Sequence, residues 1–394
     1  MFRLTSLPFK TIHRTASTVA SSSGRAQLLQ RRDDDVVITF AKRTAMGRAK
    51  KGQFKDVPVD ELLHALFKAT LDKTKLNPAS IDDICVGTCH PPSPLYVSRA
   101  AALAAGIPES VPISTVNRLC SSGLMAISLG VAVGAESMSL NPRPTPVVAD
   151  AVSANPQARD CIQPMGWTSE MVAQTYDISR QKQDEYALTS HTRAVKALSD
   201  YPHEIRGNVV SVDDTIRSNV SAEGLAALKP SFPEWGSAST TAGNASGVGD
   251  GAALCILTTR ARAEAEGFDI LAKFVGTAIV GVEPRHMGIA PIYAIPKVLE
   301  QTGLNQQDID VYEINEAFAS QFAYCAEQLM IPMDRINPNG GSIALTHPLG
   351  MTGVRQVVTG LEELRRRNGD FLCTSMCVGS GLGAAGIFVN ERRS

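Results

Sequence analysis

The sequence lacks the features that mark several large classes of proteins. It has no excess of one charge, because 38 basic and 39 acidic residues leave a net charge of −1, which offers no electrostatic attraction for nucleic acid or anionic lipid. No apolar run reaches the ~20 residues that cross a bilayer. The eight cysteines have no zinc-ribbon spacing, which favours reduced thiols. We therefore expect no membrane, nucleic-acid or metal partner, and instead a small-molecule ligand or another subunit.

Acidic residues are also missing from the first 32 positions, where Arg and Lys occur among many Ser and Thr residues and Asp33 is the first carboxylate. A basic, acid-free leader is typical of a mitochondrial presequence, and a disordered basic tail is the alternative. We expect a leader that ends near residue 32.

The remaining length allows two or three domains. Val36–Phe40 is a short β-branched strand, residues 60–75 have helical spacing of leucines, residues 81–87 form a second strand, and residues 98–106 an Ala-rich helix that ends at glycine. Strand and helix in alternation predict an α/β layer with a largely parallel sheet.

The sequence also contains an internal repeat. Leu-Asn-x-x-x-Ile-Asp occurs at 76–82 and again at 304–310, each time after an amphipathic helix and before a strand, an Ala-rich helix and an Ile-Pro pair. An offset of more than two hundred residues favours two homologous halves, with chance similarity as the alternative. The Pro-rich and polar stretch 141–235 separates the halves and is typical of an insertion that covers a site.

The first candidate site residue is Cys120, in the segment Val116–Ala126. Ser121, Ser122 and Gly123 follow it, which predicts a turn into a short buried helix that ends near residue 129. Backbone N–H groups at such a turn favour a thiolate and a nucleophilic sulfur, although an inert core cysteine is the alternative.

The second half supplies three further candidates. Asn315 follows the strand Val311–Ile314 and is predicted at the start of a helix, where it could act only as a cap. His347 lies in a Pro/Gly turn and could serve as a base. Cys377 precedes Gly379 and Gly381 after another strand, where a titratable thiol would meet bare backbone N–H groups.

These residues resemble the thiolase family, and most closely the 3-ketoacyl-CoA thiolases of fatty-acid β-oxidation. The resemblance covers almost the whole chain after Asp33 and rests on seven segments in order: Asn117-Arg118-x-Cys120-Ser121-Ser122-Gly123-Leu124, Gly134-Ala135-Glu136-Ser137-Met138, Met165-Gly166, Ala242-Gly243-Asn244-Ala245-Ser246, Asn315-Glu316-Ala317-Phe318, His347-Pro348-Leu349-Gly350 and Cys377-x-Gly379-x-Gly381.

The resemblance implies two βαβαβαββ halves in a five-layer α-β-α-β-α fold with an inserted loop domain. The expected division is a leader at 1–32, an N-terminal half at 33–140 and 236–260, a loop domain at 141–235 and a C-terminal half at 261–394. It also implies a homodimer or homotetramer, coenzyme A as co-substrate and no permanently bound cofactor.

Roles follow by position in the family. Cys120 would attack the 3-keto carbon after His347 takes its proton, and Cys377 would protonate the acetyl-CoA enolate and then deprotonate the incoming coenzyme A. Asn315 would hold a water at the enolate oxygen, and the N–H groups of Cys120 and Gly379 would bind the acyl oxyanion. The positions that match the pantetheine channel are Ser246, Met165 and Phe318.

The chain departs from the family at four places. Leu119, Thr346 and Met351 stand where Gln, Gly and Cys are usual, and the helix after Cys120 lacks about three turns. We therefore expect reduced stability or activity. The alternatives to thiolysis are acetyl-CoA acetyltransferase activity and a catalytically impaired subunit or acyl-CoA binder. Arg3-Leu4 does not continue into the family's peroxisomal leader signal, so we expect the mitochondrial matrix, with the peroxisome as alternative.

Overall fold

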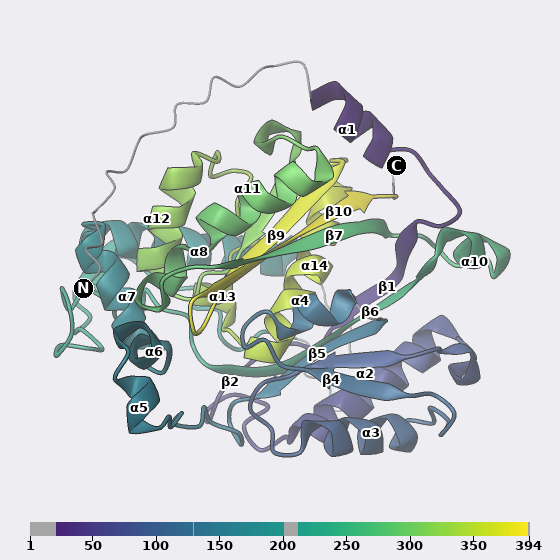
Figure 1. The fold of residues 1–394 in the computed structure, drawn as a ribbon, viewed down its shortest axis with the longest axis horizontal. Helices are drawn as coiled ribbons and strands as arrows, with labels where there is room; N and C mark the ends of the chain where they lie inside the picture. Colours follow the sequence, from purple (N-terminus) through teal and green to yellow (C-terminus); the bar gives the residue numbers. More distant parts are fainter. Residues whose placement is uncertain (1–20, 129, 201–211, 393–394) are drawn as a thin grey trace, which may run out of the picture.

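The computed structural model describes residues 21–128, 130–200 and 212–392 (Figure 1). Within these ranges ten strands join into one mixed sheet, in the order β4-β3-β5-β6-β1-β7-β10-β9-β8 with β2 beside β6. The strands are β1 (Val36–Arg43), β2 (Gly47–Arg48), β3 (Ile84–Gly87), β4 (Ile113–Val116), β5 (Val131–Ser137), β6 (Gly249–Thr259), β7 (Ala272–Gly281), β8 (Val311–Ile314), β9 (Phe371–Val378) and β10 (Leu382–Asn390). No helix of the described ranges is long and apolar enough to span a membrane.

The sheet consists of two halves with the same pairing pattern. β3 is parallel to β4 and β5, and β5, β6 and β1 follow in antiparallel order. In the second half, β8 is parallel to β9, and β9, β10 and β7 follow in antiparallel order, while a parallel bridge from Tyr312 to Ile336 takes the place of β4. Two residue pairs between β1 and β7 join the halves. The repeat predicted from the sequence is thus a repeat of topology.

The repeated Leu-Asn segments have the same local structure. Each forms a 3-10 turn, η1 (Pro78–Ser80) or η3 (Gln306–Asp308), that begins after Asn77 or Asn305. Both asparagines occupy the N-cap position, where the side-chain oxygen can accept a backbone N–H. Each turn leads directly into the strand that begins its half's parallel pair.

Helices cover both outer faces and fill the middle. α2 (Val59–Thr74) and α3 (Pro94–Ala104) pack on the N-terminal half, and α11 (Pro291–Thr302) and α12 (Ala319–Leu329) pack on the C-terminal half. Between the halves lie α4 (Ser122–Ile127) and α14 (Leu349–Arg366), which contact each other (Figure 1). The layers therefore alternate α-β-α-β-α, as expected.

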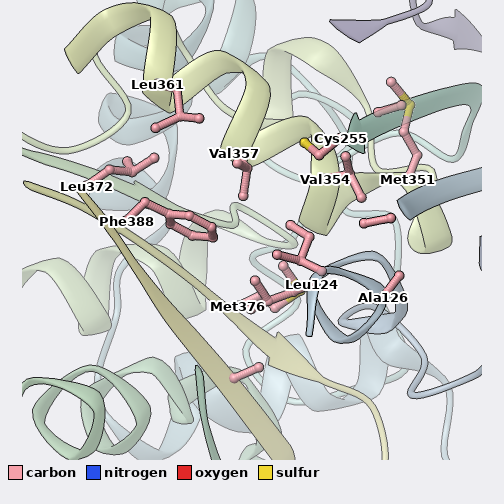
Figure 2. Packing of buried hydrophobic residues seen from close by; sticks show 14 of the residues in the cluster. Leu124, Ala126, Cys255, Met351, Val354, Val357, Leu361, Leu372, Met376 and Phe388 are labelled. Carbon is pink, nitrogen blue, oxygen red and sulfur yellow. The ribbon is translucent and has the colours of Figure 1, made fainter. Parts of the chain in front are cut away.

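The largest apolar cluster occupies this middle layer (Figure 2). Leu124 and Ala126 of α4 and Val354 and Val357 of α14 belong to this cluster, and all four side chains are fully buried. The backbones approach closely, since a Cβ on Gly353 would lie 2.3 Å from the amide nitrogen of Leu124. This packing fixes the helix that follows Cys120 against the helix that follows His347.

The middle layer is asymmetric, because α4 has 6 residues and its counterpart α14 has 18. Beyond the end of α4, Phe274 and Val358 are only partly buried, and a Cβ on Gly276 would meet nothing within 4 Å. The second half of α14 therefore has no partner helix from the N-terminal half among the described residues.

The remaining helices lie mostly between β5 and β6. They are α5 (Asp150–Ser153), α6 (Pro156–Cys161), α7 (Met165–Thr175), α8 (Arg180–Asp200) and α9 (Ala222–Ala226), with α10 (Arg260–Ala265), η2 (Pro284–Ile289) and α13 (Ser342–Leu345) elsewhere in the chain. α7 and α8 pack against α12, and α8 also contacts α13. This arrangement places the helical segment beside the turn that carries His347.

Part of the predicted leader packs against the C-terminal half. α1 (Ser21–Leu28) is held by an ion pair from Arg25 to Asp370, and the Arg25 guanidinium lies 5.2 Å from the centre of the Phe371 ring. Leu28 joins the adjoining apolar cluster, and Lys273 donates a 2.8 Å hydrogen bond to the carbonyl of Gln30. Residues 25–30 of the predicted leader therefore contact the C-terminal half, whereas residues 1–20 lie outside the described residues.

Candidate active site

Cys120 lies in a tight turn between β4 and α4 that depends on Leu119. Leu119 has a φ of +46°, which is unusual for a residue with a Cβ. Its N–H donates to Asn117 Oδ1 at 2.9 Å, and its carbonyl accepts the Ser122 hydroxyl at 2.6 Å. These hydrogen bonds hold the strained residue directly before the buried Cys120.

Two backbone N–H groups converge on the Cys120 sulfur. Burial raises the pKa of the Cys120 thiol to about 11, while the N–H groups of Gly379 and of Cys120 itself lower it. A Cβ on Gly379 would lie 2.9 Å from a methyl carbon of Leu119, so a side chain at this position would require the Leu119 side chain to move. The resting sulfur is a protonated thiol between two donors that could bind an oxyanion.

His347 is fixed at both ring nitrogens. Asn315 Nδ2 donates to His347 Nε2 at 3.2 Å, and Asn315 Oδ1 accepts the Ser342 hydroxyl at 2.6 Å. On the other side, His347 Nδ1 lies 2.6 Å from the Thr352 hydroxyl, which donates to the carbonyl of Pro348. Nδ1 is therefore the protonated nitrogen, and Nε2 carries the lone pair that accepts the hydrogen bond from Asn315.

The electrostatic surroundings keep this imidazole neutral. Burial lowers the pKa of His347 to about 3, and the Arg355 guanidinium lowers it further. A neutral ring with an oriented Nε2 lone pair is the form that a general base requires.

Cys377, the residue before the end of β9, has no exposed surface and donates its thiol hydrogen to Gln321 Oε1 at 3.4 Å. Burial raises the pKa of Cys377 well above its ordinary value, and the neighbouring Cys120 raises it further. The influence of Cys120 on Cys377, and the hydrogen bond from the Gly379 N–H to the Cys120 sulfur, place the two thiols from different halves close together. Both are free thiols.

The three predicted channel residues gather around Cys377. Met165, at the first turn of α7, and Phe318 pack against the cluster that contains Cys377 and Met287. Ser246 is adjacent, because its N–H and its hydroxyl both donate to the carbonyl of Ala317, at 3.0 and 2.9 Å. The structure thus brings together the predicted residues of both halves and of the helical segment.

One local prediction is wrong. Asn315 does not begin a helix: α12 starts at Ala319, and Phe318 is extended, with φ −145° and ψ 148°. Phe318 forms a β-bridge with Ala245, and this long-range pairing keeps the segment after β8 extended. Asn315 consequently turns its amide toward His347 and caps nothing.

Sequence reasoning missed three residues that orient the site: Thr352, Ser342 and Gln321. Thr352 follows His347 by five residues in α14, and its hydroxyl selects the imidazole tautomer. Ser342 and Gln321 act from α13 and α12. Only their positions near the recognised segments could have indicated them, because their roles depend on the packing of the two halves.

The departures from the family pattern have structural consequences. Thr346 has φ 73° and ψ 172°, a region that normally requires glycine, and its buried hydroxyl has no hydrogen-bond partner within the described part of the chain. The Thr346 side chain fits because residue 249 is glycine. A Cβ on Gly249 would lie 2.3 Å from the Thr346 hydroxyl oxygen. Met351 is fully buried in the middle layer.

Comparison with known proteins agrees with this fold. Residues 36–261 match the family description "Thiolase, N-terminal domain" and residues 268–390 match "Thiolase, C-terminal domain". The peroxisomal 3-ketoacyl-CoA thiolase B of Rattus norvegicus is 45% identical over 405 aligned residues, which cover 95% of this chain and 95% of the rat protein. The chain belongs to the thiolase family.

Solved structures give the same result. The dimeric peroxisomal thiolase of Saccharomyces cerevisiae superposes with a TM-score of 0.87 at 40% identity, covering 93% of this chain and 100% of the yeast chain. The human mitochondrial 3-ketoacyl-CoA thiolase in complex with CoA superposes with a TM-score of 0.81 at 34% identity, covering 91% of this chain and 98% of that chain. Thiolases use CoA as a substrate and need no permanently bound cofactor.

The comparisons overturn the expected mitochondrial location. The relatives from rat, human, Arabidopsis thaliana and Candida tropicalis are all named peroxisomal, and the yeast peroxisomal structure is more similar than the human mitochondrial one. The prediction was wrong because it depended on the net charge of the leader, whereas a targeting receptor recognises particular residues.

Proposed function

We propose that this chain is an acyltransferase that cleaves 3-ketoacyl-CoA with coenzyme A, giving acetyl-CoA and an acyl-CoA two carbons shorter. The observation that carries the proposal is a pair of neighbouring free thiols, Cys120 and Cys377, in a site that also contains a neutral imidazole, His347, with its proton on Nδ1. A hydrolase would use one thiol and one base and would leave Cys377 without a role.

In the first half-reaction, Cys120 Sγ attacks the C3 carbonyl carbon and its proton passes to His347 Nε2. A thiol with a pKa of about 11 is protonated at neutral pH, so it becomes a nucleophile only when a base removes its proton. The C2–C3 bond then breaks, leaving an acyl group on Cys120 and the enolate of acetyl-CoA. Cys377 donates the proton that completes acetyl-CoA.

In the second half-reaction, the Cys377 thiolate takes the proton of an incoming coenzyme A thiol. The coenzyme A sulfur attacks the thioester carbon, and the N–H groups of Cys120 and Gly379 stabilise the tetrahedral oxyanion. The Cys120–acyl bond breaks, and the sulfur recovers its proton from His347. Atoms and protons balance over the two steps.

The rest of the site has supporting roles in this proposal. Asn315 orients the imidazole and holds a water toward the enolate oxygen. Ser246, Met165 and Phe318 line the channel for the pantetheine arm, and the helical segment 141–235 covers it as a loop domain between the halves 33–140 with 236–260 and 261–394. The peroxisomal relatives and the dimeric yeast structure support a peroxisomal homodimer.

A second candidate, an impaired subunit or acyl-CoA binder, is favoured by one observation. α4 has only 6 residues, and the rat alignment spans 405 positions, more than the 394 residues of this chain, so the chain has gaps relative to that relative. A shortened α4 would weaken the support of Cys120 without removing any catalytic group.

Mass spectrometry of the Cys120 peptide separates the two candidates. The purified full chain is incubated with a medium-chain 3-ketoacyl-CoA, digested, and compared with C120S. A thiolase forms an acyl adduct on Cys120 and releases acetyl-CoA, while a binder forms neither. Running the reaction from acetyl-CoA alone tests the related condensing activity of an acetyl-CoA acetyltransferase.

A further inference from the structure

Glu136, in β5, is a buried carboxylate for which the described residues provide no ion-pair partner, and its side chain has no exposed surface. It accepts the N–H groups of Cys89 at 3.0 Å, His90 at 3.1 Å and Gly350 at 2.9 Å. Cys89 and His90 follow β3 in the N-terminal half, whereas Gly350 lies in the first turn of α14, three residues after His347.

One oxygen of this carboxylate joins the two halves of the molecule. Glu136 Oε2 accepts from both Cys89 and Gly350, and Oε1 accepts from His90. Hydrogen bonds to an ionised acceptor are shorter and stronger than neutral ones. The loop after β3 and the start of the histidine-bearing helix are therefore held at one point.

The same loop is hydrogen-bonded to the turn that carries Cys120. The Cys89 thiol donates to the carbonyl of Leu119 at 3.0 Å, and Asn117 Nδ2 donates to the carbonyl of Cys89 at 3.1 Å. Burial, with the Glu136 charge next, raises the pKa of Cys89 well above its ordinary value, so the thiol keeps the hydrogen it donates. Cys89 thus holds the strained residue that immediately precedes the proposed nucleophile.

We propose that Glu136 is a positioning residue, acting through Cys89, that sets the turn of Cys120 against the turn of His347. The two turns come from opposite halves, and the reaction requires their side chains in one geometry. The inference rests on the proposed function, since it concerns the same nucleophile and base. A misplacement of about 1 Å between reacting groups costs a reaction on the order of 10²-fold.

Charge tuning is the competing explanation, and it has the opposite sign. The negative charge of Glu136 raises the pKa of the Cys120 thiol, so a neutral side chain at this position makes the thiolate easier to form. If charge alone mattered, Glu136→Gln would leave turnover unchanged or increase it. If positioning matters, turnover falls although the sulfur is no less reactive.

The test compares Glu136→Gln with the matched control Asp250→Asn. Asp250 is an equally buried carboxylate on the neighbouring strand β6, and it accepts the N–H of Ser139 at 2.8 Å without touching either turn. We expect E136Q to lose about 10- to 100-fold in kcat with KM within twofold, and D250N to keep its kcat within twofold. Alkylation of Cys120 by iodoacetamide, followed on its peptide, should be at least as fast in E136Q as in the wild type.

The cysteine pair C89A and C89S gives an independent reading if E136Q does not fold. We expect C89A to lose severalfold in kcat and C89S, which keeps a donor, to recover it. Three results would overturn the inference without affecting the proposed thiolysis by the wild type. They are a kcat of E136Q within twofold of the wild type, a loss of kcat in D250N equal to that in E136Q, and a C89A variant as active as C89S. A wild-type chain without thiolysis overturns the proposed function and the inference together.

Discussion

Replacement of Arg355 by Met tests how much of the middle layer depends on one buried ion pair. Arg355 Nη1, in α14, lies 2.7 Å from Glu313 Oε2, in β8, and the two side chains are 1% and 0% exposed. Removing one partner of such a pair leaves an uncompensated buried charge and costs about 3–5 kcal/mol. At an unfolding entropy of ~2.1 cal/mol/K per residue, a loss of this size lowers the melting temperature of a chain of 394 residues by roughly 4–6 °C.

The loss should depend on pH. Burial raises the pKa of Glu313 to about 7, with Arg355 opposing the rise. A carboxyl whose pKa is higher in the folded state favours folding below its ordinary pKa and loses this contribution as pH increases through the folded value. Without the guanidinium the pKa increases further, so R355M should be closer to the wild type at pH 5.5 than at pH 8 in calorimetric melts.

Two controls sharpen this measurement. The double variant E313Q/R355M removes both charges and should recover most of the stability. R365M removes an exposed pair, Arg365 with Glu362, and should cost at most about 1 kcal/mol. A melting temperature of R355M within 1 °C of the wild type at pH 8 would refute the reasoning.

Three further changes probe the middle layer and the site. Leu124→Ala removes a fully buried side chain of α4 and should lower the free energy of unfolding in urea by about 3–5 kcal/mol. The control V358A, at a partly buried position, should lower it only slightly. A loss below 1 kcal/mol for L124A would mean that α4 is not held by this packing. Thr352→Val removes the hydroxyl that accepts the His347 Nδ1 proton, so the imidazole is no longer held in one tautomer, and kcat should fall about 10²-fold at unchanged KM. T352S keeps the hydroxyl and is the active control. Equal kcat of T352V and T352S would contradict the tautomer assignment. Cys377→Ser should abolish thiolysis while Cys120 still reacts with iodoacetamide; an active C377S would remove the proton-transfer role.

Sequence patterning predicted the parts of the fold that depend on local periodicity. The strand Val311–Ile314 has the predicted bounds, and the helix expected at 60–75 is α2, Val59–Thr74. The helix expected at Asn315 failed because the bridge between Phe318 and Ala245 is a contact between distant segments. Local propensity contains no information about such a partner.

The same distinction applies to the site. Cys120, His347 and Cys377 stood out because each lies in a glycine-rich turn at the end of a strand or helix. Thr352 and Glu136 act on them through hydrogen bonds that form only when the two halves pack. The residues proposed to touch a substrate were therefore readable from the sequence, whereas the residues that orient them required the structure.

The central claim is that Cys120 carries the acyl group between the two half-reactions. The most direct measurement is the mass of the Cys120 peptide after the full chain reacts with a 3-ketoacyl-CoA, before and after coenzyme A is added. We expect an acyl adduct on Cys120 that disappears, with release of the shortened acyl-CoA, when coenzyme A is supplied. An adduct on Cys377 or Cys89 in place of Cys120, or turnover with Cys120 never modified, would contradict it.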